Sequence, residues 1–550
     1  MSSPALSVGS RVPASALSAR LLPLISMLAV LLALAPIVLL LLSWRFDQSD
    51  IWAHLLATQL PTLLRNTLVL VVGVGVGVSL LGVALAWLTA MCEFPGRRFF
   101  DWALMLPLAV PAYVLGFAAL GIFDFSGPLQ QSLQGLLGER YQFVDVRGEV
   151  MVVAVMVLVL YPYVYMLSRS AFLAQSSDVI EAARILGLGR WGVFCKVELP
   201  MARPAIVAGV SLALMETLAD FGTVAVFNYD TFTTAIYKSW FALFNLQAAA
   251  QLASVLLLFV ALALAGERYS RGRRSFVQSV RRQRRQRLLL PRPQAFAASA
   301  FCALILLLAF ISPLLQLLHW AVGEGLDALN SRYFALLKHT LLLGGAAALT
   351  TVMVALMLAF NRRRTAPHLR VFFDLGTLGY ALPGSVLAVG LMLCFALLDR
   401  EVIAPLQGAL GLVSAPVLLG SVGALVVAYC IRFLAVASGP VQASLERIGD
   451  NIPEAAASLG AKRWRLLRHI YLPMLRPGLL TAAVLVLVDV MKEMPATLLL
   501  RPFGWDTLAV RVYEMTSEGE WQRAALPALT LVVVGLVPVV LALRQSSAGR

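Results

Sequence analysis

The stretch EAARILGLGRWGVFCKVELPMARP at residues 181–204 returns as EAAASLGAKRWRLLRHIYLPMLRP at residues 454–477. Twelve of the 24 positions are identical, and the two copies are offset by 273 residues. The tetrapeptides RNTL at 65–68 and KHTL at 338–341 match at the same offset. Because self-similarity at a fixed spacing marks a duplicated structural unit, the chain of 550 residues is predicted to contain two related halves.

The composition places both halves in a membrane. Hydrophobic residues form 60% of the chain and charged residues 13%, whereas a soluble domain is about half apolar and about a quarter charged. These values exclude an ordinary soluble enzyme and a disordered chain. Ten stretches of at least 18 residues contain no charged side chain, and about 20 apolar residues are enough to cross a bilayer as a helix.

Two further segments regain their apolar pattern beyond a single acid, Glu216 or Asp489. We therefore predict an all-α polytopic membrane protein with twelve transmembrane helices, arranged as two parallel six-helix repeats. The expected spans are residues 21–44, 66–92, 102–123, 151–168, 204–222, 239–266, 293–323, 339–361, 375–398, 402–431, 477–498 and 524–543. A cleavable signal peptide is the alternative for the first span, but the apolar run continues to Leu42, which favours a retained helix.

Positive charge orients the predicted helices. With the N-terminus inside, cytoplasmic segments hold 32 of the 44 Lys and Arg residues and external loops hold 11, so both termini are expected in the cytoplasm. The expected domains are a first transmembrane domain at 1–266, an Arg-rich cytoplasmic linker at 267–295 and a second transmembrane domain at 296–550. Two such domains in one chain would enclose a pathway at their interface.

The linker carries most of the excess positive charge, because residues 267–292 contain ten Arg and one Glu. Such a run can bind the phosphates of nucleic acid or of anionic lipid. No DNA- or RNA-binding motif accompanies it, so we expect membrane lipid as a partner and no nucleic acid. Five scattered cysteines without CxxC spacing support neither a disulfide framework nor a cysteine metal site.

Each repeated block is predicted to form a short helix, a turn and a second short segment. Glu-Ala-Ala favours a helix whose small residues permit close approach of a partner, and the glycine six residues after the Glu can take the positive φ that ends it. An Arg-Trp pair begins the second segment, and a Leu-Pro pair is expected to stop it and redirect the chain into the next membrane helix. The candidate docking residues are Glu181, Ala182, Ala183, Gly187 and Arg190 in the first block and Glu454, Ala455, Ala456, Gly460 and Arg463 in the second.

These paired blocks resemble the EAA loop of permease subunits in binding-protein-dependent ABC importers. The resemblance implies a type I importer permease with both halves fused in one chain, in a bacterial inner membrane. It implies that the candidate docking residues contact two copies of an ATPase subunit, which carry ATP and Mg. It also implies a periplasmic or extracellular binding protein that delivers the substrate. No cofactor is expected on the chain itself.

The substrate is indicated by two further stretches. ADFGTVAVFNYDTFTTAIYKSW at 219–240 and KEMPATLLLRPFGWDTLAVRV at 492–512 resemble ferric-iron permeases of this class. Permeases for thiamine and for polyamines share much of the pattern, so these substrates stay as alternatives.

Two other classes of function are alternatives to an importer permease. A P-loop needs GxxxxGK[ST], and the sequence has no Gly-Lys dipeptide, so ATP hydrolysis is expected on separate subunits and not on this chain. An ion-coupled secondary transporter is the rival, although it has no need of the paired blocks. A membrane-embedded enzyme is opposed by the lack of any catalytic constellation in the sequence.

Four acids within the predicted helices are the candidate substrate pathway or gate: Glu216, Asp220, Asp489 and Glu493. Each pair has a spacing of four, which places it on one helical face. Ionisable groups in a bilayer usually face a protein interior or a watery path, and carboxylate oxygens suit a hard cation such as Fe(III). The alternative is a structural role, with Lys492 neutralising one of the acids. Whether this chain binds a metal is left unassigned.

Three tyrosines and three histidines are weaker candidates for metal ligands. Tyr161, Tyr163 and Tyr165 are interpreted as an aromatic belt at the membrane interface rather than as iron ligands. The histidines at 54, 319 and 339 are isolated and lack metal-ligand spacing.

Overall fold

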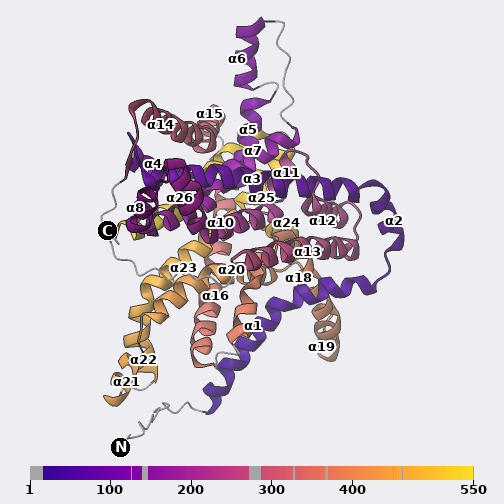
Figure 1. Cartoon of the computed structure of the whole chain (residues 1–550). Helices are drawn as coiled ribbons and strands as arrows, with labels where there is room; N and C mark the ends of the chain where they lie inside the picture. The colour runs from indigo at the N-terminus through magenta and orange to yellow at the C-terminus, as the bar shows by residue number, and fades with distance from the viewer. Residues whose placement is uncertain are drawn as a thin grey trace, which may run out of the picture.

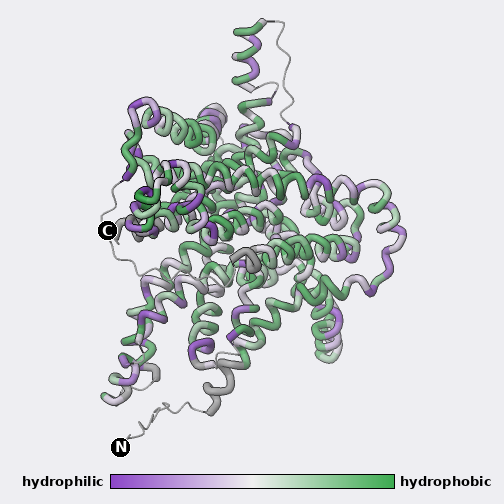
Figure 2. The backbone as a smooth tube through the Cα atoms, in the orientation of Figure 1, coloured by the Kyte–Doolittle hydropathy of each residue, from purple (hydrophilic) through white to green (hydrophobic). Residues whose placement is uncertain are grey.

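Long helices dominate the architecture, because apolar segments in lipid must satisfy their backbone hydrogen bonds internally. The computed structural model describes residues 16–124, 127–138, 147–271, 287–325, 329–365, 370–449, 451–460 and 463–548 (Figure 1). Within them, eleven helices are long and apolar enough to cross a membrane, and the bent pair Arg370–Ala381 and Gly384–Ala409, with an angle of 114°, makes a twelfth span when counted as one. The predicted all-α membrane fold is confirmed, and Figure 2 shows hydrophobic residues along most of the long helices.

The first half contains six long helices joined by short ones. The long helices are α1 (Ala16–Leu42), α3 (Leu60–Met91), α5 (Ala112–Phe123), α7 (Glu149–Ala174), α10 (Leu199–Ala219) and α13 (Leu246–Arg271). The connecting elements are η1 (Ser43–Arg45), α2 (Ser49–Thr58), β1 (Cys92–Glu93), α4 (Arg97–Ala103), η2 (Leu106–Ala109), α6 (Pro128–Leu137), α8 (Ser177–Ile185), α9 (Arg190–Val193), the π-helix η4 (Phe194–Glu198), α11 (Gly222–Val226) and α12 (Phe232–Phe241).

The second half repeats this order. Its membrane helices are α14 (Arg292–Leu306) with η5 (Leu307–Ile311) and α15 (Ser312–Glu324), then α16 (Ser331–Arg364), α18 (Gly384–Leu398), α20 (Val422–Glu446), α23 (Leu472–Lys492) and α26 (Trp521–Ala548). The connecting elements are β2 (Leu288–Leu289), α17 (Arg370–Leu375), η8 (Gly376–Ala381), η9 (Asp399–Ile403), α19 (Ala404–Ala409), α21 (Asn451–Ser458), α22 (Arg463–Leu466), the π-helix η10 (Leu467–Tyr471), α24 (Pro495–Leu500) and α25 (Leu508–Ser517).

The tenth predicted span, residues 402–431, is displaced in the structure. η9 and α19 extend the preceding helix, and the membrane helix that follows is α20. As a result Arg432, which would have stood at the cytoplasmic end of the predicted span, lies in the interior of α20. The prediction was wrong because an uncharged run does not reveal where a helix bends. The apolar residues that follow Arg432 continue the hydrophobic pattern of the membrane helix.

The first helix of each half packs against the other half. Val30 and Ala33 of α1 belong to the core formed by α16, α18 and α20, and a Cβ at Gly390 of α18 would stand 2.8 Å from Pro36 Cβ. On the other side, Cys302 of α14 and Trp320 of α15 belong to the core of the first half. The predicted domains, at 1–266, 267–295 and 296–550, stay a prediction. In the structure, the first helix of each predicted transmembrane domain packs in the core of the other domain.

Close helix packing explains the glycine run in α3. A Cβ at Gly82 would lie 2.7 Å from Val164 Cβ of α7, so a larger residue would force the two helices apart. Small residues at helix contacts are typical of membrane bundles. The glycines of α3 at 73, 77 and 82 therefore form a packing surface for α7.

Candidate functional site

The two repeated blocks form matching structures, which we call the first coupling loop (residues 181–200) and the second coupling loop (residues 454–473). In the first, α8 ends at Ile185, and Gly187 follows with φ +87° before α9 begins at Arg190. In the second, α21 ends at Ser458, and Gly460 has φ +80° before α22. The predicted helix, glycine turn and second segment are therefore confirmed.

The predicted role of the Leu-Pro pairs is wrong. The helix does not stop, because α9 continues through η4 into α10, and α22 continues through η10 into α23. Pro200 lies in the first turn of α10, and Pro204 lies inside the same helix. A π-helical turn directly before each Leu-Pro pair changes the hydrogen-bond register where proline supplies no N–H. Each coupling loop is consequently continuous with a membrane helix.

Apolar side chains of both coupling loops are exposed. Ile185, Leu186 and Trp191 are 86%, 83% and 74% exposed in the first loop, and Leu459 is 88% exposed in the second. In Figure 1 α8 and α21 both lie on the left of the molecule, whereas α2 and α12 lie on the right.

The candidate docking residues divide by exposure. Glu181, Ala182, Gly187, Arg190, Glu454, Ala455 and Gly460 are exposed, Ala456 is half-buried and Ala183 is buried. The side chain of Arg463 lies outside the described part of the structure. An exposed surface of this kind can accept a partner protein, and the docking role of these residues remains a prediction.

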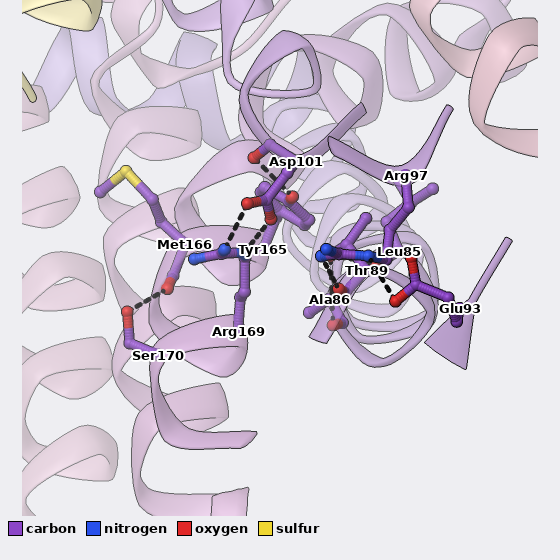
Figure 3. Close-up of polar contacts among 10 residues, drawn as sticks. All are labelled: Leu85, Ala86, Thr89, Glu93, Arg97, Asp101, Tyr165, Met166, Arg169 and Ser170. Carbon is purple, nitrogen blue, oxygen red and sulfur yellow. Dashed lines mark hydrogen bonds and ion pairs between the residues drawn. The ribbon is translucent and has the colours of Figure 1, made fainter. Parts of the chain in front are cut away.

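Behind the first coupling loop, polar side chains attach it to the membrane helices. Trp87 Nε1 of α3 donates to Glu198 Oε2 at 2.7 Å, and Gln175 Nε2 donates to the Glu198 carbonyl oxygen at 2.8 Å. Glu198 itself is only 6% exposed. In the same half, Arg169 of α7 donates from Nε to Asp101 Oδ1 at 2.5 Å and from Nη2 to Asp101 Oδ2 at 2.6 Å. Figure 3 shows Arg169 and Tyr165 of α7 directed toward Asp101.

The four candidate pathway acids lie around one cavity between the halves. Its volume is about 210 Å³, and it is lined by residues of both halves, including Glu216, Asp220, Asp489 and Glu493. A wider hollow of about 800 Å³ lies beside Trp320 and Trp521. Its charged residues stand at or next to helix ends rather than within membrane helices, so the interface cavity is the stronger candidate.

Within the cavity, Asp220 and Glu493 hold short helices. Asp220 Oδ1 accepts from the N–H groups of Thr223 at 2.9 Å and Val224 at 3.2 Å, at the start of α11. Glu493 Oε1 accepts from the N–H of Ala496 at 3.1 Å, at the start of α24. Carboxylates at helix N-termini satisfy N–H groups that have no partner inside the helix.

Three residues that the sequence analysis did not single out complete the cavity. Arg432 Nε lies 2.8 Å from Glu493 Oε2, and the two side chains are 12% and 6% exposed. Tyr380 Oη donates to Glu216 Oε1 at 3.4 Å, and Tyr113 lines the same cavity. The signal for Arg432 was present, because the apolar residues after it continue the helix just as they do after Glu216.

Lys492 makes a contact that the sequence did not predict. Its Nζ donates to the carbonyl oxygen of Leu108, across the boundary between the halves, at 3.2 Å. Glu493 is paired with Arg432 instead. Both bases therefore act on the acids: Arg432 pairs with Glu493, and Lys492 is the positive charge that acts most strongly on Asp489.

The tyrosines of α7 are buried rather than arranged as a belt. Tyr161 and Tyr165 are fully buried and donate to the carbonyl oxygens of Leu104 and Asp101, each at 2.9 Å, while Tyr163 lines the interface cavity. The belt prediction was wrong because a position near the end of a membrane helix does not show whether the side chain faces lipid or a neighbouring helix. Among the described residues, no three His, Cys, Asp or Glu side chains form a metal-binding group.

Comparison with known proteins gives a consistent result. The family model described as "Binding-protein-dependent transport system inner membrane component" matches residues 78–269 and again 351–547. The Fe(3+)-transport system permease protein FbpB 2 of Haemophilus influenzae is 30% identical over 88% of this chain and 90% of its own. The molybdenum transport system permease protein ModB of Escherichia coli is 35% identical over 26% of this chain and 62% of its own. The sulfate transport system permease protein CysT of Escherichia coli is 29% identical over 36% of this chain and 69% of its own.

Proposed function

The chain belongs to the family of binding-protein-dependent transport system inner membrane components, and we propose that it is the permease that moves ferric iron in an ATP-driven importer. Its two family matches and many apolar helices make it a multi-pass ABC importer permease of the inner membrane. The relatives are transport permeases and not enzymes. The proposal concerns the cargo, the partners and the way they are coupled.

The charge of the interface cavity is the observation that carries the choice of cargo. Four carboxylates and two bases, Arg432 and Lys492, line it, which gives a net charge of −2 in their ionised forms. A cavity of this sign favours a cation and opposes an oxyanion such as molybdate or sulfate, because like charges repel strongly where water is scarce. The likeness to a permease named for Fe(3+) over nearly the whole chain supports the same cargo.

The coupling loops supply the connection to an energy source. Their exposed apolar residues and their continuity with α10 and α23 suit a surface on which two ATPase subunits, carrying ATP and Mg, dock one per loop. Closure of those subunits would draw the loops together and move α10 and α23, which carry Glu216 and Asp489 and end directly before Asp220 and Glu493. A binding protein outside the membrane would deliver the cargo, with both termini of this chain in the cytoplasm.

Transport by the reconstituted importer tests the cargo. We expect vesicles that contain the permease, its ATPase and its loaded binding protein to accumulate radiolabelled ferric iron when supplied with ATP. Thiamine, spermidine and molybdate serve as competing cargoes in parallel vesicles. Uptake of one of these in place of iron would contradict the proposal, and uptake without any ATPase would favour an ion-coupled secondary transporter.

Charge reversal in both coupling loops tests the connection to the ATPases. The double variant Glu181→Lys with Glu454→Lys should reduce uptake to background while the protein remains in the membrane, since both glutamates are exposed and predicted to face the partners. Glu401→Lys, at another exposed acid, is the matched control and should transport normally. Normal uptake by the double variant would remove the coupling role.

A further inference from the structure

We propose that Glu216 and Asp489 are the carboxylates that contact the transported cation, together with the phenol oxygens of Tyr113, Tyr163 and Tyr380. The other two acids of the cavity, Asp220 and Glu493, act as helix caps and not as ligands. The inference rests on the proposed function for the identity of the cargo, but the site itself is argued from the contacts around the cavity.

The capping acids are equivalent in the two halves. Asp220 and Glu493 are related by the repeat offset of 273, and so are the residues whose N–H groups they accept, Thr223 and Ala496. Asp220 also accepts from Thr223 Oγ1 at 2.9 Å, and Glu493 also pairs with Arg432. Their oxygens therefore already have partners within the protein. Both acids stabilise the junction between a membrane helix and the short helix that follows it, α10 to α11 and α23 to α24.

The acids one turn earlier cap no helix, although the charges of Arg432 and Lys492 act on both of them. Glu216 accepts only the 3.4 Å bond from Tyr380 Oη among the hydrogen bonds found, and no hydrogen bond or ion pair joins Asp489 within the described residues. Both are half-buried and line the cavity, one from each half. A carboxylate within a membrane helix is costly and usually marks an ion or substrate pathway.

A buried phenol without a partner supplies independent support. Tyr113 is 6% exposed, lines the cavity, and its Oη has no hydrogen-bond partner in the described part of the chain. Buried polar groups are normally paired, so this hydroxyl is open to a group that enters the cavity. Tyr163 and Tyr380 line the same space.

The ligand chemistry fits a passing cation rather than a resident one. Carboxylate and phenol oxygens are hard donors that suit a hard, highly charged cation. No three His, Cys, Asp or Glu side chains converge among the described residues, so the site lacks the dense ligand set of a tight metal centre. Weak, multi-site binding is what conduction requires, because a cargo that binds too tightly does not leave.

Terbium luminescence tests the site without transport. Tb³⁺ is a hard trivalent cation whose emission is excited through nearby tyrosine, so the purified permease in lipid nanodiscs should show tyrosine-sensitised Tb³⁺ emission. The double variant Glu216→Gln with Asp489→Asn should bind at least about tenfold more weakly, since loss of even a supporting group of a metal site costs roughly 10–100-fold in affinity. Tyr113→Phe should lower the emission.

Two comparison variants keep the result interpretable. Asp374→Asn removes one exposed carboxylate outside the cavity and should leave the Tb³⁺ signal unchanged. Asp220→Asn removes the charge but keeps the oxygen that accepts from Thr223 and Val224, so it should keep both the Tb³⁺ affinity and the temperature of unfolding. Wild-type Tb³⁺ affinity in a folded Glu216→Gln, Asp489→Asn variant would overturn the site, as would loss of binding in Asp220→Asn alone.

Failure of this inference is separable from failure of the proposed function. Normal Tb³⁺ binding that depends on Glu216 and Asp489, combined with no iron uptake, would support the site and reject iron as the cargo. Iron uptake that is unaffected by the same double variant would support the proposed function and reject the site.

Discussion

The two coupling loops are copies in sequence, yet they are attached to the membrane helices by different chemistry. In the first, Trp87 donates to Glu198 at 2.7 Å. The residues at the equivalent positions of the second half, 273 further along the chain, are Phe360 and Tyr471, whose rings meet edge to face at 5.1 Å. A buried hydrogen bond to a carboxylate in one half has thus become an aromatic contact in the other.

Two equivalent aspartates, Asp101 and Asp374, form ion pairs that differ in their exposure. Asp101 pairs with Arg169 of α7, and the side chains are 13% and 14% exposed. Its counterpart Asp374 pairs with Arg362 of α16 at 3.0 Å, with side chains 52% and 31% exposed. The second half also uses Arg363, which donates to the Ile448 carbonyl oxygen at 2.8 Å beyond the end of α20.

This comparison teaches that a repeat can conserve a surface while its supports diverge. The exposed face of each loop keeps its helix and its glycine turn, whereas the contacts behind it depend on local burial. Since one chain always supplies one copy of each loop, neither attachment has to serve in both halves.

The largest predicted difference concerns the ion pairs. Arg169→Ala breaks a two-bond ion pair with the largely buried Asp101 and should cost about 3–5 kcal/mol of stability. Arg362→Ala breaks a more exposed pair and should cost about 1 kcal/mol or less. Thermal unfolding of both variants in the same detergent measures the difference. Equal losses of stability would show that the two ion pairs contribute equally.

A smaller difference is predicted at the aromatic position behind each loop. Trp87→Phe removes the donor to the buried Glu198 carboxylate and should cost about 1–3 kcal/mol. Phe360→Leu loses an aromatic pair worth about 0.5–1.5 kcal/mol. The iron transported per ATP hydrolysed is the second readout, and it should fall more for Trp87→Phe because that bond joins the loop to α3. The reverse order in that ratio would refute the asymmetry.

The smallest effects should be equal in the two halves. Gly187→Ala and Gly460→Ala both force alanine into a left-handed conformation, which costs about 1–2 kcal/mol. Neither Cβ would meet another atom within 4 Å, so no clash adds to the strain. Matching shifts in unfolding temperature for the two variants would show that the two halves share the glycine turn and differ only in the contacts that attach each coupling loop to the membrane helices. Unequal shifts would mean that the asymmetry extends into the turn.

The sequence predicted the helices, the repeat and the turns of the coupling loops, because hydrophobic run length and glycine spacing are local properties. It also identified all four acids that line the cavity. It was wrong about the Leu-Pro pairs, which follow a π-helical turn, and about Tyr161 and Tyr165, which are buried. In each case the deciding fact was a neighbouring helix and not the residue type. Arg432 was missed because its helix was placed too early in the chain.

The sequence by itself determined that this chain lies in a membrane, that it contains two copies of one unit, and which residues bring charge into its helices. Only the tertiary structure decided that α1 packs against the second half and α14 and α15 against the first. It also decided that Arg432 pairs with Glu493, whereas Asp489 lines the cavity near the charge of Lys492. The physical reason is that periodicity and hydropathy state which face of a helix is apolar, whereas the partner of a buried charge depends on how helices from distant parts of the chain come together.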